Sequence, residues 1–538
     1  MTQKQEWGSR LGVILAVSGS AVGLGNFLRF PGQAAQNGGG SFMIPYFCAL
    51  LLLGIPIGWA EWAMGRYGGR KGFHSAPAIL GVIGKGAIAR YLGVIGVLIP
   101  LAVYFYYLLI ESWCLAYAYE YFTGGIGVNG KAPIDEQNRV SKAFFDNIAG
   151  NEFDGVMVGG GIHESVVFWA IVFAVNVFFV YRGLSKGIEK FCQWAMPAMA
   201  VCAVVVLVRV LTLGTPDPAK PDQNVVNGLG AMWNPSFEAL ANPQTWLAAA
   251  GQIFFSLSVG FGVIINYASY LRRRDDVVVS GITASSTNEL FEVGFGGMIT
   301  IPAAFVFLGA SGTLAAVQTG SFGLGFQTLP VVFAQMPAGN LIGGIWFFML
   351  FLAAITSSLS MLQPTLAFFE EALGVSRRKA MTLVVIVALA GSAFVIWFSK
   401  GGVARDTLDN WVGTLGIFVL AMVQIVCFGW VFGIERGWSA IHEGAHLKLW
   451  PVFKFVFKYV TPLYLIAVFL AFCWNNLGDW WAKVLESPVQ QMTIGLIVAT
   501  IVLLVIITRI GEKRWRALGL DLDGREPPAD ETRGGGAR

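Results

Sequence analysis

Polar side chains interrupt several long apolar stretches of this sequence. They are Asn26, Ser256, Ser258, Asn288, Glu292 and the run Thr356-Ser357-Ser358. Hydroxyl, amide and backbone carbonyl oxygens form the oxygen-rich sites that hard cations prefer. A lone hydroxyl in an apolar helix more often bonds to its own backbone. Taken together, these groups indicate a site for a monovalent cation.

Three carboxyl side chains also lie within apolar stretches, namely Glu61, Glu111 and Glu292. A carboxyl inside a membrane-spanning helix is costly and is a functional candidate by default. Glu292 lies one helical turn from Asn288, which favours a functional role. For Glu61 and Glu111, a neutral structural hydrogen-bonding role is the favoured interpretation.

One short motif occurs twice, as Val22-Gly23-Leu24-Gly25 and as Val259-Gly260-Phe261-Gly262. Glycine costs a helix about 1 kcal/mol relative to alanine, so paired glycines in mid-span predict unwound backbone. Such backbone survives at membrane depth only where it lines a cavity or is buried in protein. There, helix ends can hold an anion and free carbonyls a cation. Small residues also let helices pack closely, but two copies five helices apart favour a binding site in an inverted repeat.

The composition requires a membrane to hold these elements. Of 538 residues, 55% are hydrophobic and 13% charged, against about 25% charged in soluble domains. The net charge of +4 argues against a nucleic-acid partner. The six cysteines lie in apolar stretches, at spacings that give no disulfide framework or metal site. No small-residue cleavage site follows the first apolar stretch, so we expect that helix to be retained.

A helix needs about 20 apolar residues to cross the hydrocarbon, and twelve stretches qualify. They lie near 10–37, 41–65, 91–122, 165–181, 191–213, 243–270, 283–309, 340–369, 380–399, 410–433, 453–475 and 488–508. Loops that alternate along the chain are rich in Lys and Arg, and cytoplasmic loops retain these residues. We therefore expect twelve spans with both termini in the cytoplasm.

Three connecting segments have distinct compositions. The segment 123–164 is rich in Gly, Asp and Glu, and we expect it outside. The segment 317–339 has no charge and is predicted to fold back as a lid. The tail 511–538 is polar without an apolar period, which predicts disorder.

Two motifs suggest enzymes. His442-Glu443-Gly444-Ala445-His446 fits the HExxH zinc motif, but no suitably spaced third ligand follows. Gly125 to Lys131 resembles a P-loop, but Ala132 replaces the hydroxyl that would hold magnesium. We therefore expect no enzyme. A sodium-activated channel or amino-acid sensor remains an alternative to a transporter.

Several motifs carry a family resemblance. They are Lys4-x-x-Trp7, Gly23-Leu24-Gly25-Asn26-Phe27-Leu28-Arg29-Phe30-Pro31, Asn37-Gly38-Gly39-Gly40, Gly251-Gln252-Ile253-Phe254-Phe255-Ser256-Leu257-Ser258 and Thr356-Ser357-Ser358. From about residue 4 to 510 the sequence resembles the neurotransmitter:sodium symporter family. The resemblance implies an all-α membrane protein of the LeuT fold, with twelve transmembrane helices. Two inverted five-helix repeats would contain the unwound first and sixth helices.

The resemblance also divides the chain. The expected parts are a cytoplasmic N-terminus at 1–9 with Lys4 and Trp7, a first repeat at 10–213, an external loop at 214–242, a second repeat at 243–436, helices eleven and twelve at 437–510 and the tail at 511–538.

Two sodium sites follow from the resemblance. The first comprises Ala21, Asn26, Ser256 and Asn288, and the substrate carboxylate completes it. Ser256 stands where the family usually has Thr, and it keeps the hydroxyl. The second comprises the carbonyls of Gly19, Val22 and Ala353 with the hydroxyls of Thr356 and Ser357.

The implied substrate site comprises Ala21, Gly23, Leu24, Gly25, Val103, Tyr107, Phe255, Ser256, Ser258, Phe261, Ser357 and Met361. The substrate carboxylate would meet the amides of Leu24 and Gly25 and the Tyr107 hydroxyl. Monoamine carriers of the family place an Asp at the Gly23 position. With Gly23, the substrate must bring its own carboxylate, which predicts a neutral amino acid with an aliphatic or apolar side chain.

The resemblance further implies two gate pairs, Arg29 with Asp409 outside and Lys4 with Glu371 inside, and places Tyr270 among the gate residues. Glu292 would take the place of chloride, so chloride is not expected to be required. The expected function is sodium-coupled symport of the amino acid into the cell by alternating access. The expected location is the inner membrane, the partners are the amino acid and the lipid bilayer, and a homodimer is left open.

Overall fold

A computed structural model describes residues 7–158, 161–318 and 320–526. The first half of the chain contains α1 (Arg10–Ala21), α2 (Phe30–Gln36), α3 (Gly40–Ala49), α4 (Ile55–Arg70), α5 (Ala76–Ile83), α6 (Ala87–Leu92), α7 (Ile95–Thr123), α8 (Ile134–Ala149), α9 (Glu164–Tyr181), α10 (Lys190–Leu211), α11 (Val225–Trp233), α12 (Phe237–Leu240), α13 (Pro243–Leu257) and α14 (Val263–Ala268). Two two-residue strands, β1 (Met157–Val158) and β2 (Gly161–Ile162), pair in antiparallel fashion.

The second half contains α15 (Val277–Glu289), α16 (Met298–Gln318), α17 (Gly320–Gly323), α18 (Leu329–Ala334), α19 (Gly339–Leu373), α20 (Arg377–Trp397), α21 (Val403–Leu408), α22 (Leu415–Val426), α23 (Ile434–His442), α24 (Val452–Phe455), α25 (Thr461–Glu486) and α26 (Pro488–Ala517). Many spans are continued by π-helical turns, at Gly25–Arg29, Leu50–Gly54, Leu184–Glu189, Leu290–Gly297, Leu324–Thr328, Asp409–Thr414, Cys427–Gly433 and Val456–Val460. A 3-10 turn covers Lys400–Gly402.

Ten helical segments of the described chain are long and apolar enough to span a membrane. An eleventh forms if α1 is joined to Gly25–Gln36, across a 47° bend. The one remaining expected span, 243–270, is divided into α13 and α14, and neither helix is long enough alone to cross a membrane. The difference from the predicted twelve therefore arises at the two predicted breaks.

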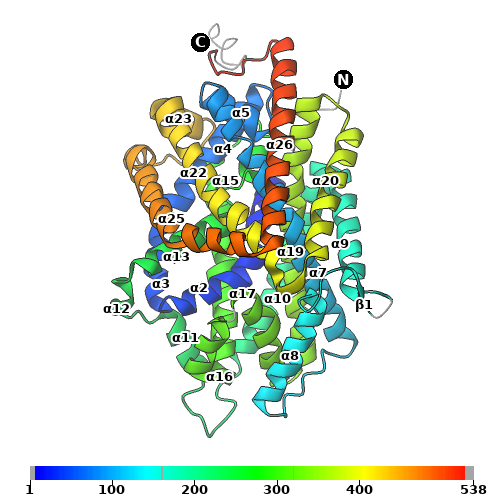
Figure 1. The fold of residues 1–538 in the computed structure, drawn as a ribbon. Coiled ribbons are helices and arrows are strands. Elements are labelled where there is room, and N and C mark those ends of the chain that lie inside the picture. The colour runs from blue at the N-terminus through cyan, green and yellow to red at the C-terminus, as the bar shows by residue number, and fades with distance from the viewer. Residues whose placement is uncertain (1–6, 159–160, 319, 527–538) are drawn as a thin grey trace.

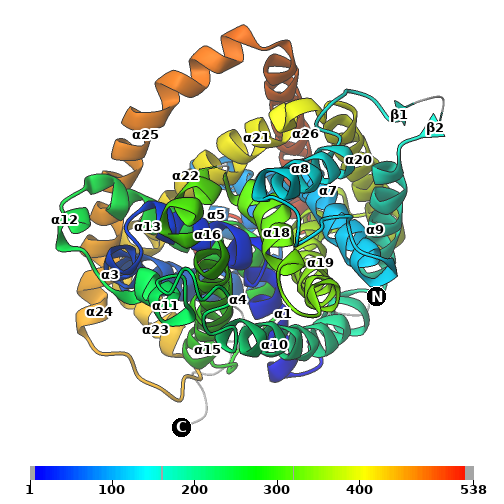
Figure 2. The same cartoon turned by 90° about the horizontal axis from the view of Figure 1, so that it is seen from below.

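The helices form one upright bundle, which Figure 1 shows from the side. We call the end at the top of Figure 1 the basal end; α5, α23 and the end of α26 lie there. The opposite end, where α8 and α11 lie, is the apical end. Most residues in the apolar segments of α7 and α19 are buried inside the bundle. Helix α25 lies at the outer edge of the bundle, as Figure 2 shows.

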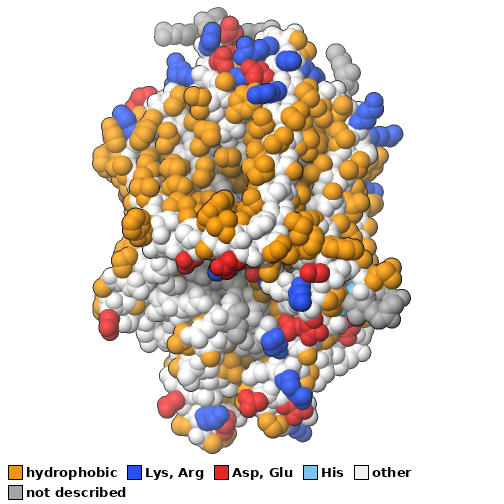
Figure 3. Space-filling model, in the orientation of Figure 1, with side chains coloured by type: hydrophobic (Ala, Val, Ile, Leu, Met, Phe, Trp, Pro, Cys, Tyr) orange, Lys and Arg blue, Asp and Glu red, His pale blue; other side chains and the backbone are white. Residues whose placement is uncertain are grey.

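The surface of the bundle matches a bilayer. Figure 3 shows a broad hydrophobic band around the visible face, with charged side chains gathered above and below it. Exposed apolar residues on the peripheral helices include Val201, Ile386, Leu470 and Val502. Apolar surface of this extent is stable only against hydrocarbon. The chain is therefore a multi-pass membrane protein.

The uncharged segment 317–339 packs against the apical end, as predicted for a lid. Its residues from Leu329 to Phe333 are buried. The Tyr117 hydroxyl donates a hydrogen bond to the carbonyl of Phe326 at 2.7 Å, and Ser141 Oγ donates one to the carbonyl of Gln327 at 2.6 Å. These bonds fix the segment to α7 and α8.

The prediction that 511–538 is disordered is wrong for residues 511–526. Helix α26 continues to Ala517, and Leu522 beyond it is buried. Asp521 forms an ion pair with Lys71 Nζ at 2.7 Å, and Asp523 forms one with Arg90 Nη2 at 2.8 Å. Composition alone missed these pairs because their basic partners lie more than 400 residues earlier in the chain. The rest of the predicted tail, 527–538, lies outside the described residues.

Candidate functional site

Both glycine motifs coincide with breaks in helices, as predicted. Helix α1 ends at Ala21, and helical structure resumes only at Gly25. Between α13 and α14, Ser258, Gly260 and Gly262 have φ angles of 54°, 69° and 90°. This left-handed region is strained for residues with a side chain. A Cβ at Gly262 would also lie 2.0 Å from the carbonyl oxygen of Gly96, so only glycine fits there.

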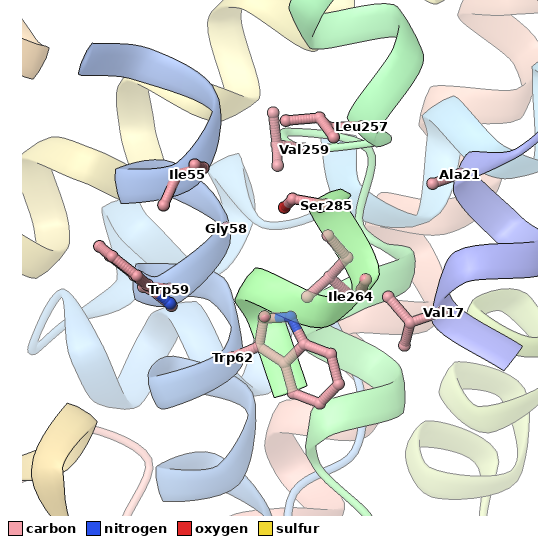
Figure 4. Close-up of a pocket in the computed structure, with 12 residues that line it drawn as sticks. Val17, Ala21, Ile55, Gly58, Trp59, Trp62, Leu257, Val259, Ile264 and Ser285 are labelled. Carbon is pink, nitrogen blue, oxygen red and sulfur yellow. The ribbon is translucent and has the colours of Figure 1, made fainter. Parts of the chain in front are cut away.

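The space basal to the breaks is apolar and nearly filled. Figure 4 shows Val17 and Ala21 of α1 on one side of this space and Ile55 and Trp59 of α4 on the other, with Leu257, Val259 and Ile264 between them. The cavity between them measures about 20 Å³, which is room for about one water molecule. The chemistry of the site therefore lies on the other side of α1, toward α7 and α19.

The hydroxyl of Ser357 is surrounded by backbone carbonyl oxygens. It lies 3.4 Å from the oxygen of Gly19, 3.2 Å from that of Ser20, 3.4 Å from that of Val22 and 3.1 Å from that of Ala353. One hydroxyl carries one hydrogen and can satisfy one of these acceptors well. The residue is buried, with a relative exposure of 2%. So many oxygens around one point match the environment that a small cation needs.

The other predicted member of this cluster is Thr356. Its Oγ1 lies 3.0 Å from the Ala353 carbonyl and 3.1 Å from that of Leu352. Both bonds run back along its own helix α19. The carbonyls of Gly19 and Val22 come from the end of α1, so the cluster joins the break in α1 to α19. All five residues predicted for the second sodium site meet here.

The side chains predicted for the first sodium site form a buried chain of hydrogen bonds. Asn26 Nδ2 donates to Asn288 Oδ1 at 2.9 Å, and Asn288 Nδ2 donates to Ser256 Oγ at 2.6 Å. Asn26 Oδ1 accepts from the backbone N–H of Gly23 at 2.8 Å. The structure thus brings the three side chains together, and none of them forms a hydrogen bond with the carbonyl of Ala21.

Glu292 lies directly behind this chain and is fully buried. It accepts hydrogen bonds from Gln252 Nε2 at 2.8 Å, from Asn26 Nδ2 at 3.0 Å and from Asn288 Nδ2 at 3.3 Å. The hydroxyl of Tyr46, however, donates to the neighbouring Glu289 at 2.7 Å. The sequence interpretation missed Glu289, because adjacent helical residues normally face different sides.

The predicted carboxylate-binding groups also meet. The backbone N–H of Leu24 donates to the Tyr107 hydroxyl at 3.3 Å. A Cβ on Gly23 would lie 2.8 Å from Ser357 Oγ and 3.0 Å from the Tyr107 hydroxyl. A Cβ on Gly25 would lie 2.7 Å from the ring of Phe255. At the break in α1, the backbone of Gly23 lies close to the Ser357 and Tyr107 hydroxyls, and the backbone of Gly25 lies close to the Phe255 ring. A side chain on either glycine would clash with these neighbours.

The residues predicted to surround the substrate side chain are largely apolar and buried. They include Val103 at 2%, Phe261 at 6% and Met361 at 6% exposure. Polar groups in this region are serines. Ser20 Oγ lies 2.7 Å from Ser360 Oγ, and Ser258 Oγ lies 3.4 Å from the carbonyl of Ser20. Ser20 and Ser360 were not predicted as site residues, since isolated serines in apolar helices are common.

The predicted outer pair is not closed. No nitrogen of Arg29 lies within 4.0 Å of a carboxylate oxygen of Asp409. The Arg29 guanidinium instead stacks over the ring of Phe255 at 4.5 Å. Asp409 accepts a hydrogen bond from the Tyr106 hydroxyl at 2.6 Å. All four residues line a cavity of about 270 Å³ at the apical side of the site, so space separates the two charges.

The predicted inner pair cannot be placed as a pair, because Lys4 lies outside the described residues. Glu371 accepts hydrogen bonds from the backbone N–H of Ser75 at 2.9 Å and from Ser75 Oγ at 3.0 Å. The backbone N–H of His74 donates to the same carboxylate at 2.5 Å. Tyr270, also predicted at this gate, stacks on His74 with ring centroids 4.4 Å apart. Trp7 Nε1 donates to the carbonyl of Tyr267 at 3.1 Å.

Glu189 holds the start of α1 and was missed by the sequence interpretation. Its carboxylate accepts from the backbone N–H groups of Gly8 at 2.8 Å and Ser9 at 3.1 Å, and from Ser9 Oγ at 3.0 Å. Glu189 is 3% exposed. In sequence it lies between Lys186 and Lys190, which gave it the appearance of an ordinary charged loop.

The other acidic and histidine candidates have structural partners. Gln424 Nε2 donates to Glu61 at 2.7 Å, and Asn176 Nδ2 donates to Glu111 at 3.0 Å, which agrees with a structural role for both acids. His442 Nδ1 lies 2.8 Å from the carbonyl of Trp438, and its Nε2 accepts from the N–H of Leu449 at 3.0 Å. Both ring nitrogens are therefore engaged. Among the described residues, no three His, Cys, Asp or Glu side chains converge on a metal position.

Known proteins share this arrangement over most of the chain. The model of the sodium:neurotransmitter symporter family matches residues 4–129 and 130–516. A sodium-dependent transporter of Methanocaldococcus jannaschii is 30% identical over 476 residues, which cover 87% of this chain and 90% of the relative. The sodium- and chloride-dependent GABA transporter 2 of Rattus norvegicus is 24% identical over 504 residues, covering 87% of this chain and 80% of the relative.

A solved structure has the same fold. The crystal structure of MhsT in complex with L-phenylalanine superimposes with a TM-score of 0.72 at 26% identity, and covers 87% of this chain and 99% of MhsT. The fold is the LeuT fold, and members of this family are transporters rather than enzymes. The helix breaks, the oxygen cluster at Ser357 and the family match lead to one conclusion: the chain belongs to the sodium:neurotransmitter symporter family.

Proposed function

We propose that the protein is a sodium-coupled symporter that imports a neutral L-amino acid with an apolar side chain. The observation that carries the proposal is the crowding of four carbonyl oxygens within 3.1–3.4 Å of the buried Ser357 hydroxyl. The one hydrogen of the Ser357 hydroxyl can satisfy only one of these acceptors well, and a bound cation would satisfy the others. Sodium at this point would link α1 to α19 and so make helix position depend on ion binding.

A second sodium would bind at Asn26, Asn288 and Ser256, close to the carboxylate of the amino acid. The bare amides near Leu24 and the Tyr107 hydroxyl would hold that carboxylate. Because the ion and the carboxylate would share one site, each would raise the affinity of the other by the same factor. The side-chain atoms nearest to a Cβ on Gly23 belong to Ser357 and Tyr107, so none of them is an acid that could replace the substrate carboxylate.

Three observations support an apolar amino acid as the substrate. Val103, Phe261 and Met361, which the family resemblance assigns to the side-chain pocket, are buried. A charged substrate head there would be unpaired, at a cost of several kcal/mol. The fold neighbour MhsT was solved with L-phenylalanine, so an aromatic side chain is included in the proposed class along with aliphatic ones.

Chloride is not required in the proposed cycle. Glu292 accepts bonds from Gln252, Asn26 and Asn288 and would supply a fixed negative charge beside the first sodium site. Its carboxylate would take the place of the anion that chloride-dependent relatives bind. On this proposal, Glu292→Ser makes uptake dependent on chloride, whereas wild-type uptake is unchanged when gluconate replaces chloride.

Transport would proceed by alternating access. Sodium and the amino acid would enter through the apical cavity, which Arg29, Asp409 and Phe255 line. Closure would bring Arg29 and Asp409 together, and the start of α1 would then leave its basal contacts. A membrane potential contributes about 2.3 kcal/mol per charge per 100 mV to inward movement. The proposed orientation has both termini in the cytoplasm at the inner membrane, and it leaves homodimer formation open.

The test is uptake of radiolabelled leucine, methionine and phenylalanine into proteoliposomes. We expect uptake with an inward sodium gradient, none when choline replaces sodium, and none for Thr356→Ala or Asn26→Ala. The matched control is Thr382→Ala, which removes a threonine hydroxyl from the exposed surface of α20. Full uptake driven by a proton gradient in sodium-free buffer would refute sodium coupling. Binding of dopamine or GABA, with no binding of any α-amino acid, would refute the substrate class.

A further inference from the structure

Glu111 of α7 begins a buried chain of polar side chains that leads to α19. Glu111 Oε1 accepts a hydrogen bond from Asn176 Nδ2 of α9 at 3.0 Å, and Asn176 Oδ1 accepts one from Ser358 Oγ of α19 at 2.8 Å. All three residues have a relative exposure of 0%. Ser358 directly follows Ser357 in the sequence, so the chain ends beside the proposed second sodium site.

The hydrogens available to Asn176 determine the direction of these bonds. Its amide nitrogen carries two hydrogens, which are donated to Glu111 Oε1 and to the backbone carbonyl of Val172 at 3.1 Å. The amide oxygen therefore faces α19 and accepts the hydroxyl hydrogen of Ser358. If Glu111 could not accept a bond, the amide could turn over and place its nitrogen against Ser358. Glu111 thus ensures that α9 presents an acceptor to α19.

Ser358 is anchored differently from the hydroxyl residues that precede it on α19. The hydroxyls of Thr356 and Ser357 lie 3.0 and 3.1 Å from the carbonyl of Ala353 in their own helix. Ser358 Oγ lies 3.2 Å from the carbonyl of Ile355, but its shorter bond is the one to α9. A hydrogen bond to another helix restrains the rotation of α19, which a bond within α19 cannot do.

The anchored face of α19 lies opposite the face that meets α1. Successive residues of an α-helix are rotated by about 100° around its axis, so Thr356 is rotated by about 200° from Ser358. A Cβ on Gly19 of α1 would lie 3.3 Å from Cβ of Thr356, which shows that Thr356 faces α1. A rotation of α19 would therefore move Thr356 and Ser357 relative to the carbonyls of α1. Ion ligands must keep their distances within about 0.2 Å.

We propose that Glu111 is a positioning residue for the second sodium site, on which it acts through Asn176 and Ser358 without touching the ion. The inference rests on the proposed function, because it assumes sodium at Ser357. Groups that hold the ligands of a metal ion typically change its affinity by about 10–100-fold when they are removed. A carboxyl in a membrane span is also costly to keep and is a functional candidate by default.

The alternative is that these bonds only attach α9 to the bundle. Asn and Ser side chains often join helices in membranes in this way. Helix α9 lies at the edge of the bundle (Figure 2), and its buried residues Val172, Asn176 and Val180 are spaced four apart. Attachment alone predicts that loss of Glu111 lowers thermal stability at every sodium concentration and leaves the sodium affinity unchanged.

The test measures the unfolding temperature of the full-length protein in detergent during a sodium titration, with choline keeping the ionic strength constant. Amino acid is omitted, because its carboxylate would strengthen binding at the first site. We expect Glu111→Ala to need about tenfold more sodium than the wild type for half-maximal stabilisation. Asn176→Ala should behave in the same way. Glu111→Gln should stay close to the wild-type value, because its amide oxygen still accepts the bond from Asn176.

The matched control is Ser392→Ala on α20. Ser392 is 1% exposed and accepts a hydrogen bond from Trp169 Nε1 of α9 at 2.7 Å. This variant loosens the attachment of α9 away from α19, so it should lower the unfolding temperature without changing the sodium concentration at half-maximal stabilisation. If Glu111→Ala does not fold, Ser358→Ala takes its place, because it removes the last bond of the chain with a smaller change.

An unchanged sodium affinity in the folded Glu111→Ala or Ser358→Ala variant would overturn the positioning role and leave sodium coupling intact. An equal loss of affinity in Ser392→Ala would also overturn it, because any loosening of α9 would then suffice. A loss in Glu111→Gln as large as that in Glu111→Ala would show that the accepted bond is not the cause. A wild-type protein that sodium does not stabilise would refute the sodium site itself, and with it both proposals.

Discussion

Helix α1 and its continuation meet the bundle in two different ways. At the basal end, Glu189 accepts three hydrogen bonds from Gly8 and Ser9, and Trp7 donates one to Tyr267. At the apical end, the Arg29 guanidinium stacks on the ring of Phe255, beside a cavity of about 270 Å³. The basal contacts are directional and charge-assisted, whereas the apical contact is a cation–π stack.

This difference indicates which movements are costly. Hydrogen bonds to a buried carboxylate must all be replaced when the start of α1 moves away. Moving a guanidinium away from an aromatic ring costs less free energy, because the cation–π contact is worth only about 0.5–2 kcal/mol. The structure is therefore closed at the basal end and has room to move at the apical end. Opening toward the basal side therefore requires the bonds to Glu189 to be broken.

The largest effect should come from Glu189→Ala. Loss of three charge-assisted bonds should favour opening at the basal end by about 3 kcal/mol, or a factor of about 100. The measurement uses Val13→Cys, which is now 3% exposed, in a chain with its six natural cysteines replaced. A membrane-impermeant thiol reagent should label it much faster in the variant.

Glu189→Gln is the matched control, because an amide oxygen still accepts one or two of the bonds. It should show an intermediate labelling rate. Unchanged labelling in Glu189→Ala would remove the distinction between the two ends.

A smaller effect is expected from Arg90→Ala, which tests the basal end through stability. Arg90 is fully buried and meets Glu512 at 3.0 Å and Asp523 at 2.8 Å. Both acids are partly exposed, so we expect a loss of about 2 kcal/mol rather than the full value for a buried pair. The control Arg516→Ala breaks an exposed pair with the same Glu512 and should lower thermal stability little. Equal losses in both variants would contradict the assignment.

At the apical end, Arg29→Ala should weaken amino-acid retention about fivefold, through the lost stack on Phe255. Asp409→Asn should act independently, since the two charges are not paired here. Dissociation constants for the single and double variants in sodium give the coupling energy. We expect it below about 0.5 kcal/mol, and a value above about 1 kcal/mol would show that the pair is closed in solution.

The smallest effect concerns pH at the basal end. Burial alone would raise the pKa of Asp521, but hydrogen bonds from Lys71 and from the N–H groups of Glu526 and Arg525 outweigh it and lower that pKa below its ordinary value of 3.8. A lowered pKa means that the contact stabilises the fold above pH 3.8 and is lost as pH falls through the lower value. The protection factor of the Leu522 amide, which is its exchange rate corrected for the intrinsic base-catalysed rate at each pH, should therefore stay unchanged from pH 8 to 5. A lower protection factor near pH 6 would contradict this.

The sequence predicted the features that depend on local pattern. The two breaks were predicted because Gly23, Gly25, Gly260 and Gly262 recur in the same motif, and the structure confirms both breaks. The oxygen cluster at Ser357 was predicted because the family motif fixes both of its parts. Contacts between distant residues that lie outside the family motifs were not predicted.

The errors have a common physical cause. Residues 511–526 resemble a disordered tail until Lys71 and Arg90 are brought beside them. The assignment of Arg29 and Asp409 as an outer gate stays a prediction, because charge complementarity in sequence does not specify which conformation brings the two together. Glu189 was missed because two of its three partners at the start of α1 are backbone N–H groups, which no sequence pattern marks.

The contact between Arg90 and the end of the chain has a consequence for biosynthesis. Arg90 and Asp523 are 433 residues apart. At about 5–20 residues per second, the ribosome needs on the order of tens of seconds to supply Asp523 after Arg90 has emerged. Throughout that time Arg90 lacks the acids that will neutralise it. The basal surface can therefore be completed only after α26 and the residues up to Asp523 have been synthesised.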